Sequence, residues 1–271
     1  MVDITNPDEV VTHALLREVD LTPFGFSGTL ALITLDNGMD HTRPNTLGPT
    51  SLGEFNDAIT AAEKSSASAI AITGKPFIFA AGADLSALSM LSQREQALAV
   101  GKLGHDVFRR LGESAKPTFA FINGLALGGG LEIGLHCHYR TLSATALTGL
   151  PEVFLGLIPG WGGATILPKL IGPKNAIQVI MLNALNNNTM LKPKEALALG
   201  VVDSVFAPAD FLENSVKFAA SILSGEKKID RIDHSSDELA WTEALSAGKA
   251  AMEKKYGGAE LASPLKALEL I

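Results

Sequence analysis

Two short apolar runs, residues 69–73 and 118–122, place the strongest limit on what this chain can fold into. The first run ends at Gly74 and the second at Asn123 and Gly124, so each run stops at a turn. A short continuous apolar run is typical of a strand that is buried on both faces of its sheet. Helical spacing follows each run. The alternation of strands and helices therefore predicts a layered α/β domain with strand-to-helix crossovers.

The periodicity of apolar residues also predicts the secondary structure of most of the remaining chain. It predicts a strand at 30–35, a loop at 36–45, and helices at 50–64, 86–111, 129–138, 211–223 and 237–256. Residues 1–25 are expected to lie over the surface, and the charged segment 226–233 to be exposed. The pattern changes near residue 210, which predicts a core over 1–210 and a C-terminal helical region over 211–271. A last helix is expected to begin with Ser263 as cap and Pro264 in its first turn, and nothing in the sequence stops it, as in a chain cut from a longer protein.

Composition narrows the class of protein. A chain of 271 residues with 46% hydrophobic residues can bury one large core. No apolar run approaches the roughly 18 residues of a membrane helix, and no secretory signal is visible, so we expect a cytoplasmic protein with no membrane partner. The net charge of −7 offers nucleic acid no bulk attraction. The single cysteine, Cys137, excludes an intramolecular disulfide and fits a reducing compartment.

Two glycine-rich segments, residues 79–84 (FAAGAD) and 126–132 (ALGGGLE), carry the strongest indication of chemistry. Each is predicted to be a tight turn between an apolar strand and a helix, a place where backbone N–H groups lack partners. Two such donors aimed at one carbonyl oxygen form an oxyanion hole. Glu132 ends the second segment, and Glu152 follows twenty residues later. An oxyanion hole beside two carboxyl groups is suited to stabilising an enolate while protons and water move.

Each of these residues also has an ordinary structural interpretation. Glu132 and Glu152 can be plain acids at helix starts. The glycines at 128–130 can serve close packing, and since they fail the G-x-G-x-x-G spacing we expect no nucleotide site. Asp84 is interpreted as structural, a residue that holds the turn presenting Ala83. Further residues stay open between lining an acyl pocket or active site and plain packing, namely Leu85, Leu88, Met90, Leu91 and Trp161.

A metal site is not expected where two histidines flank Cys137. Positions 136 and 138 of a helix point in different directions, so the side chains of His136 and His138 are not expected to converge on one ion.

Five sequence motifs follow one another along the chain in an order and spacing that are typical of one protein family. They are ITG at 72–74, FAAGADL at 79–85, INGLALGGGLE at 122–132, GLPEVFLGLIPGWGG at 149–163 and EALALGVVD at 195–203. Over residues 28–223 the chain resembles the enoyl-CoA hydratase/isomerase (crotonase) superfamily, and its ending resembles that of the N-terminal hydratase part of multifunctional fatty-acid oxidation proteins. The resemblance implies an α/β fold, a crotonase-like spiral of ββα units with a C-terminal helical region.

The resemblance also implies a set of site residues. The backbone N–H groups of Ala83 and Gly129 would bind the thioester oxygen, and Glu132 and Glu152 match the paired acids of hydratases. The region of Ala81 would meet the adenine of CoA, and Gly160 matches a glycine near the catalytic water. The predicted substrate-binding set is Ala81, Gly82, Asp84, Gly128 and Gly160. No metal and no cofactor is expected, because CoA is part of the substrate.

The hydration reaction needs two different proton transfers, and the two acids can each perform one of them. When water adds to a 2-enoyl thioester, one carboxylate takes a proton from water and the other acid delivers one to the α-carbon. We expect Glu132 to hold and activate the water, since a place in the first turn of a helix favours its charged form, and Glu152 to supply the α-proton. The reverse division, or one acid doing both, stays open.

The predicted function is an enoyl-CoA hydratase of fatty-acid β-oxidation. The alternatives are a Δ3-Δ2-enoyl-CoA isomerase, which needs only one carboxylate, and a non-catalytic CoA-thioester-binding subunit, which needs neither. The expected partners are an acyl-CoA substrate and either further copies in a trimer or hexamer or a fused or associated 3-hydroxyacyl-CoA dehydrogenase.

Three departures from the family pattern bear on these expectations. Residues 41–47 are longer than the usual compact turn, and residues 137–140 read CHYR rather than CDYR. The ending lacks the pattern that helps stand-alone members form trimers, which leaves the usual hexamer in question.

Overall fold

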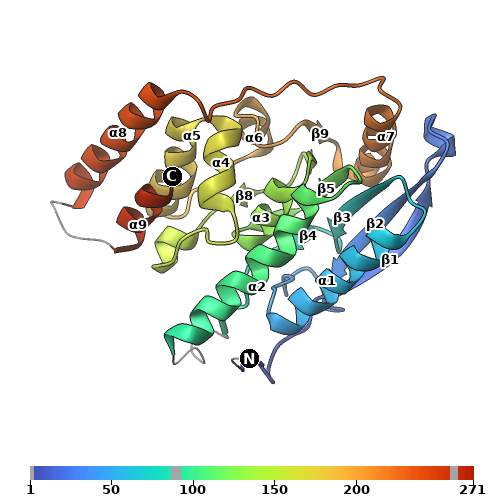
Figure 1. The fold of residues 1–271 in the computed structure, drawn as a ribbon, viewed down its shortest axis with the longest axis horizontal. Coiled ribbons are helices and arrows are strands. Elements are labelled where there is room, and N and C mark those ends of the chain that lie inside the picture. The colour runs from blue at the N-terminus through green and yellow to red at the C-terminus, as the bar shows by residue number, and fades with distance from the viewer. Residues whose placement is uncertain (1–2, 87–92, 257–261) are drawn as a thin grey trace.

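The computed structural model describes residues 3–86, 93–256 and 262–271, and it contains two sheets (Figure 1). The larger sheet has the order β1 (His13–Asp20), β2 (Thr29–Asp36), β3 (Ala69–Gly74), β5 (Thr118–Ile122), β7 (Tyr139–Ser143), β9 (Ser204–Phe206). Only β1 runs antiparallel to its neighbour. The smaller sheet pairs β4 (Ile78–Ala80), β6 (Leu125–Leu127) and β8 (Thr148–Gly149) in parallel.

The chain builds these two sheets together, as a spiral. Strands β3 and β4 lead to α2 (Arg94–Glu113), and β5 and β6 lead to α3 (Gly129–His136). Strands β7 and β8 lead to the short helix η3 (Glu152–Leu155) and then α4 (Gly163–Ile171). Each turn gives one strand to each sheet, so the turns that leave β4, β6 and β8 come together at one edge of the smaller sheet. The predicted spiral of ββα units is confirmed.

Helices cover both faces of the larger sheet, which explains its continuous apolar runs. On β2, Leu30 and Leu32 pack toward α7 (Phe211–Leu223), whereas Ala31, Ile33 and Leu35 share the main core with α1 (Pro49–Lys64) and α3. Successive side chains of a strand point to opposite faces, so a strand covered on both sides needs apolar residues at every position. The predicted strands at 30–35, 69–73 and 118–122 are confirmed.

The C-terminal helices lie beside the later turns of the spiral. The remaining elements are η1 (Thr22–Phe24), α5 (Pro173–Ile177), η4 (Gln178–Asn183), α6 (Pro193–Ala198), η5 (Pro208–Asp210), α8 (Glu238–Tyr256) and α9 (Ala262–Leu270). An extended segment joins α7 to α8, and α8 and α9 pack against α5 and α4 (Figure 1). Segment 226–233 is almost wholly exposed, as predicted. In the described part of the chain no helix is both long enough and apolar enough to span a membrane.

Residues 3–25 lie mostly at the surface, as predicted, and they contain β1, an edge strand whose mixed pattern reflects pairing with β2 alone. Several predicted helix boundaries were wrong for identifiable reasons. Helix α3 stops at His136 rather than at 138, because the buried Arg140 guanidinium donates to the carbonyls of Gly134 (3.2 Å) and Cys137 (2.6 Å) and so caps the helix end. Helix α2 begins at Arg94, and the predicted residues 87–92 lie outside the described part. Helix α9 begins one residue before Ser263, which therefore is not its cap.

Candidate active site

A cavity of about 350 Å³ lies where the turns after β4, β6 and β8 meet. Its wall contains eight of the nine predicted site residues, namely Ala81, Gly82, Ala83, Gly128, Gly129, Glu132, Glu152 and Gly160. Asp84 does not line it. Its carboxylate instead accepts bonds from Ser86 N–H (3.0 Å) and Ser86 Oγ (2.7 Å), which fits the structural interpretation. Leu85 and Trp161 line the cavity, whereas Leu88, Met90 and Leu91 lie outside the described residues.

Backbone hydrogen bonds to Leu47 shape the first glycine turn, and the N–H group of Ala83 takes no part in them. The Leu47 N–H donates to the Gly82 carbonyl (2.9 Å), and the Asp84 N–H donates to the Leu47 carbonyl (3.1 Å). Ala83 lies between these two bonds, and within the described residues its own N–H donates no bond. Asn45 links the strand β2 to the start of this turn, because its buried amide donates to the carbonyls of Leu35 (2.8 Å) and Phe79 (3.1 Å).

The role of Asn45 and Leu47 was missed in the sequence. The only signal was the unusual length of segment 41–47, which became informative once its partners were known.

The second glycine turn presents a matching donor. Gly128 has φ of 52° and gives its N–H to the Gly149 carbonyl (2.9 Å), and Gly129 then begins α3 with an N–H that no described residue accepts. A Cβ added at Gly82 would lie 3.2 Å from the Gly129 nitrogen, so the two turns touch. Gly130 also serves close packing, since a Cβ there would lie 2.0 Å from the Ala80 carbonyl oxygen. The close-packing interpretation of the glycines is therefore supported, and their role in an oxyanion hole stays a prediction.

Glu132 is buried beneath these donors, with 2% of its surface exposed. Its Oε1 accepts bonds from the backbone N–H groups of Trp161 (2.9 Å) and Gly163 (2.8 Å). Burial raises the pKa of Glu132 from 4.5 to about 7, although the two N–H donors pull the other way. Desolvation therefore outweighs the two N–H donors, which favour the charged form as a place in the first helical turn does.

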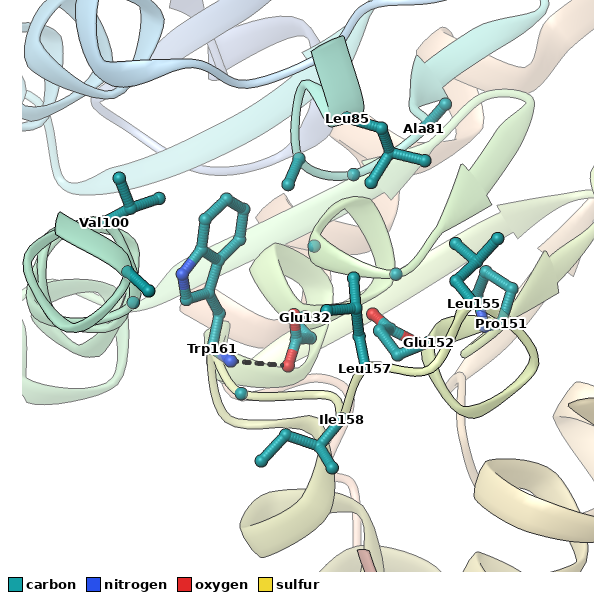
Figure 2. A pocket seen from close by; sticks show the side chains of 17 residues that line it. Ala81, Leu85, Val100, Glu132, Pro151, Glu152, Leu155, Leu157, Ile158 and Trp161 are labelled. Carbon is teal, nitrogen blue, oxygen red and sulfur yellow. Dashed lines mark hydrogen bonds between the residues drawn. The ribbon is translucent and has the colours of Figure 1, made fainter. Parts of the chain in front are cut away.

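Glu152 occupies a different environment at the start of η3. Its Oε2 is buried and has no hydrogen-bond partner among the described residues. Burial, and then repulsion from Glu132, raise the pKa of Glu152 well above its ordinary value. Figure 2 shows both carboxyl groups facing the same space. Glu132 receives N–H donors from two other residues, whereas Glu152 gains only its own backbone N–H, so Glu132 is the member of the pair that ionises more readily.

The two histidines near Cys137 serve separate contacts. The Nε2 of His136 lies 2.8 Å from the Trp161 carbonyl oxygen, and the Nδ1 of His138 accepts a bond from the Thr118 N–H (3.1 Å). These side chains do not converge, and the described residues contain no group of three or more side chains placed to hold a metal ion. Trp161 itself both lines the cavity and packs edge-on against Phe108, with ring centroids 5.3 Å apart.

The buried acids predict an unusual dependence of stability on pH. In the unfolded chain both glutamates lose their protons near pH 4.5, whereas in the folded protein Glu132 keeps its proton up to about pH 7 and burial raises the pKa of Glu152 well above its ordinary value. The unfolded state therefore binds fewer protons over this range, and the free energy of unfolding falls as pH rises from 4.5 through 7. Glu152→Gln removes the ionisable group and is expected to raise stability at pH 8 by about 1–3 kcal/mol and to have little effect at pH 4.5.

Denaturant unfolding of both proteins at the two pH values measures this difference. An equal gain at both pH values would show that packing, rather than ionisation, separates the variant from the parent.

Comparison with known proteins relates this geometry to a family. A model of the family described as "Enoyl-CoA hydratase/isomerase" matches residues 25–254. A crotonyl-CoA hydratase of Syntrophomonas wolfei is 39% identical over 182 residues, which cover 66% of this chain and 68% of that protein. The fold resembles the crystal structure of an enoyl-CoA hydratase from Bacillus anthracis, with a TM-score of 0.66, 23% identity, and coverage of 94% of this chain and 88% of the other.

A second kind of relative is much longer than this chain. The fatty acid oxidation complex subunit alpha of Shewanella frigidimarina is 37% identical over 194 residues, which cover 70% of this chain but 26% of that protein. The match therefore spans about a quarter of the longer relative.

Proposed function

We propose, from the premise that the chain belongs to the enoyl-CoA hydratase/isomerase family, that it adds water across the 2,3-double bond of a 2-enoyl-CoA thioester. One observation carries the proposal: two buried carboxyl groups in different electrostatic environments face a cavity whose wall also holds two N–H groups that no described residue accepts. Hydration needs a base for water, an acid for the α-carbon and donors for the enolate oxygen, and the cavity has a candidate for each.

The proposed reaction assigns one task to each group. The N–H groups of Ala83 and Gly129 receive the thioester oxygen as negative charge develops there. Ionised Glu132 takes a proton from water while the water oxygen bonds to carbon 3, and Glu152 gives its proton to carbon 2. The step leaves Glu132 protonated and Glu152 ionised, and return of one proton between them restores the pair. The two backbone N–H donors on Glu132, set against the unpartnered Oε2 of Glu152 among the described residues, favour this direction of transfer over the reverse.

The role in metabolism is part of the same proposal. We propose that the substrate arises in fatty-acid β-oxidation, since the relatives include proteins named crotonyl-CoA hydratase and fatty acid oxidation complex subunit alpha. The name of the longer relative, a subunit of a fatty acid oxidation complex, supports operation within, or beside, such an assembly.

Loss of the enoyl-thioester absorbance after mixing with crotonyl-CoA tests the activity. The expected result is rapid, enzyme-dependent loss with formation of the 3-hydroxyacyl product. A protein that converts a 3-enoyl-CoA into the conjugated 2-enoyl isomer but does not hydrate crotonyl-CoA would be an isomerase. A protein that binds crotonyl-CoA and leaves it unchanged would be the non-catalytic subunit.

A further inference from the structure

His136 lies outside the cavity wall and contacts segment 159–163, whose backbone N–H groups donate to the carboxyl group of Glu132. Both residues lie on α3 four positions apart, so they project from the same face of the helix. Segment 159–163 runs across that face immediately before α4. Its Trp161 has main-chain atoms bonded to both side chains: the N–H donates to Glu132, as Figure 2 shows, and the carbonyl oxygen lies 2.8 Å from His136 Nε2.

The contact requires one protonation state of the imidazole. A carbonyl oxygen only accepts hydrogen bonds, so the Nε2 of His136 must carry the proton. Burial lowers the pKa of His136 to about 4, so the ring is neutral near pH 7 and donates through Nε2. Phe108 and His105 of α2 pack against the ring, with ring centroids 6.2 Å and 5.8 Å away, and they limit its orientation.

Glycine at position 162 is what permits this close approach. Gly162 has φ of 125°, and a Cβ added there would lie 2.4 Å from His136 Nε2. The peptide between Trp161 and Gly162 is thus fixed by His136, while the peptides on either side of it point their N–H groups at Glu132 Oε1. A rotation of the central peptide would misdirect both neighbouring N–H groups.

We propose that His136 is a positioning residue: its Nε2–H fixes the Trp161 carbonyl and thereby aligns the N–H groups of Trp161 and Gly163 on the carboxylate of Glu132. The inference rests on the proposed hydratase function for its catalytic consequence, and on the contacts alone for its effect on Glu132. We call the hydrogen bond from His136 to the Trp161 carbonyl the clamp. Without the clamp, the ionised form of Glu132 loses part of its hydrogen bonding, and the pKa of Glu132 rises further.

The other ionisable groups near the pair are few. Glu152 faces Glu132 and repels its charge, and His105 and Arg109 of α2 face His136. A substitution of His136 leaves these groups in place, so a change in the pKa of Glu132 would report the hydrogen bond between His136 and Trp161.

The test compares His136→Leu, which removes the donor, with His136→Gln, which can place an amide N–H near the position of Nε2. For His136→Leu we expect kcat with crotonyl-CoA to fall roughly 10- to 100-fold, with KM nearly unchanged. The acidic limb of the kcat–pH profile should move up by about one pH unit. His136→Gln should restore most of the rate and the original profile.

His138→Leu is the matched control, since it removes the nearby histidine contact with Thr118 and leaves segment 159–163 untouched. It should lower stability without moving the acidic limb. A His136→Leu protein that loses stability and rate but keeps the parent pH profile would overturn the proposal, because histidine would then act only as packing.

A second measurement separates this inference from the proposed function. Carbon-13 NMR titration of glutamate-labelled protein, with the Glu132 signal assigned by its loss in Glu132→Gln, reports the pKa of Glu132 without turnover. An upward shift in His136→Leu together with no hydration by the parent protein would retain the clamp and reject the hydratase. Hydration by the parent with no shift in His136→Leu would retain the hydratase and reject the clamp, and failure of both would reject both.

Discussion

Replacing Glu132 by glutamine is expected to lower kcat for crotonyl-CoA hydration by about 10²- to 10⁴-fold, with a much smaller change in KM. The glutamine carbonyl can still accept the N–H groups of Trp161 and Gly163, so the backbone around the site should be retained. It cannot take a proton from water. The loss therefore belongs to the chemical step, and initial rates over a range of substrate concentrations measure it.

The companion change Glu152→Gln should cause a loss of similar size, because the α-carbon then lacks its proton donor. In the parent protein the rate should rise with pH through the pKa of Glu132, about 7, and fall once Glu152 ionises at higher pH. Glu243→Gln on the exposed side of α8 is the control and should keep the full rate. If only one of the two buried acids proved necessary, single-acid chemistry would replace the paired scheme.

Substituting alanine for Gly82 is expected to lower kcat/KM by about 10²-fold or more, because the added methyl group alone disturbs the two N–H donors. Gly82 has φ of 88°, and the added Cβ would lie 3.0 Å from the Leu127 carbonyl and 3.2 Å from the Gly129 nitrogen. The methyl group therefore separates the two turns whose N–H groups the substrate oxygen must reach together. Steady-state kinetics with crotonyl-CoA provide the measurement.

The chain offers a matched control for the backbone cost of that substitution. Gly25 has a nearly identical φ of 86°, and a Cβ there meets nothing within 4 Å. Gly25→Ala should therefore show a similar loss of roughly 1–2 kcal/mol in the free energy of unfolding and retain full activity. Equal activity losses in the two variants would mean that general destabilisation, rather than the geometry at Gly82, lowers the rate.

Local sequence predicted the parts of the site that depend on short-range rules. The glycine-rich segments 79–84 and 126–132 indicated tight turns after apolar strands, and the structure has both, with positive φ at Gly82 and Gly128. The uninterrupted apolar runs indicated strands buried on both faces. The family resemblance carried by the motifs implied the spiral, which brings the glycine turns together with Glu132 and Glu152. The division of the chain at residue 210 and the roles of the individual site residues remain predictions.

The tertiary structure decided what depends on distant residues. The edge strand β1 has no strong pattern of its own and is defined by pairing with β2. The sequence showed Glu132 in a first helical turn, yet burial under the neighbouring turns sets its pKa, because desolvation depends on everything packed around a group. The contact of His136 with Trp161 joins residues 25 positions apart. The sequence by itself thus determined which segments turn and which strands are buried, and the tertiary structure decided the environments and the partners of the acids, because both depend on atoms that are close only after folding.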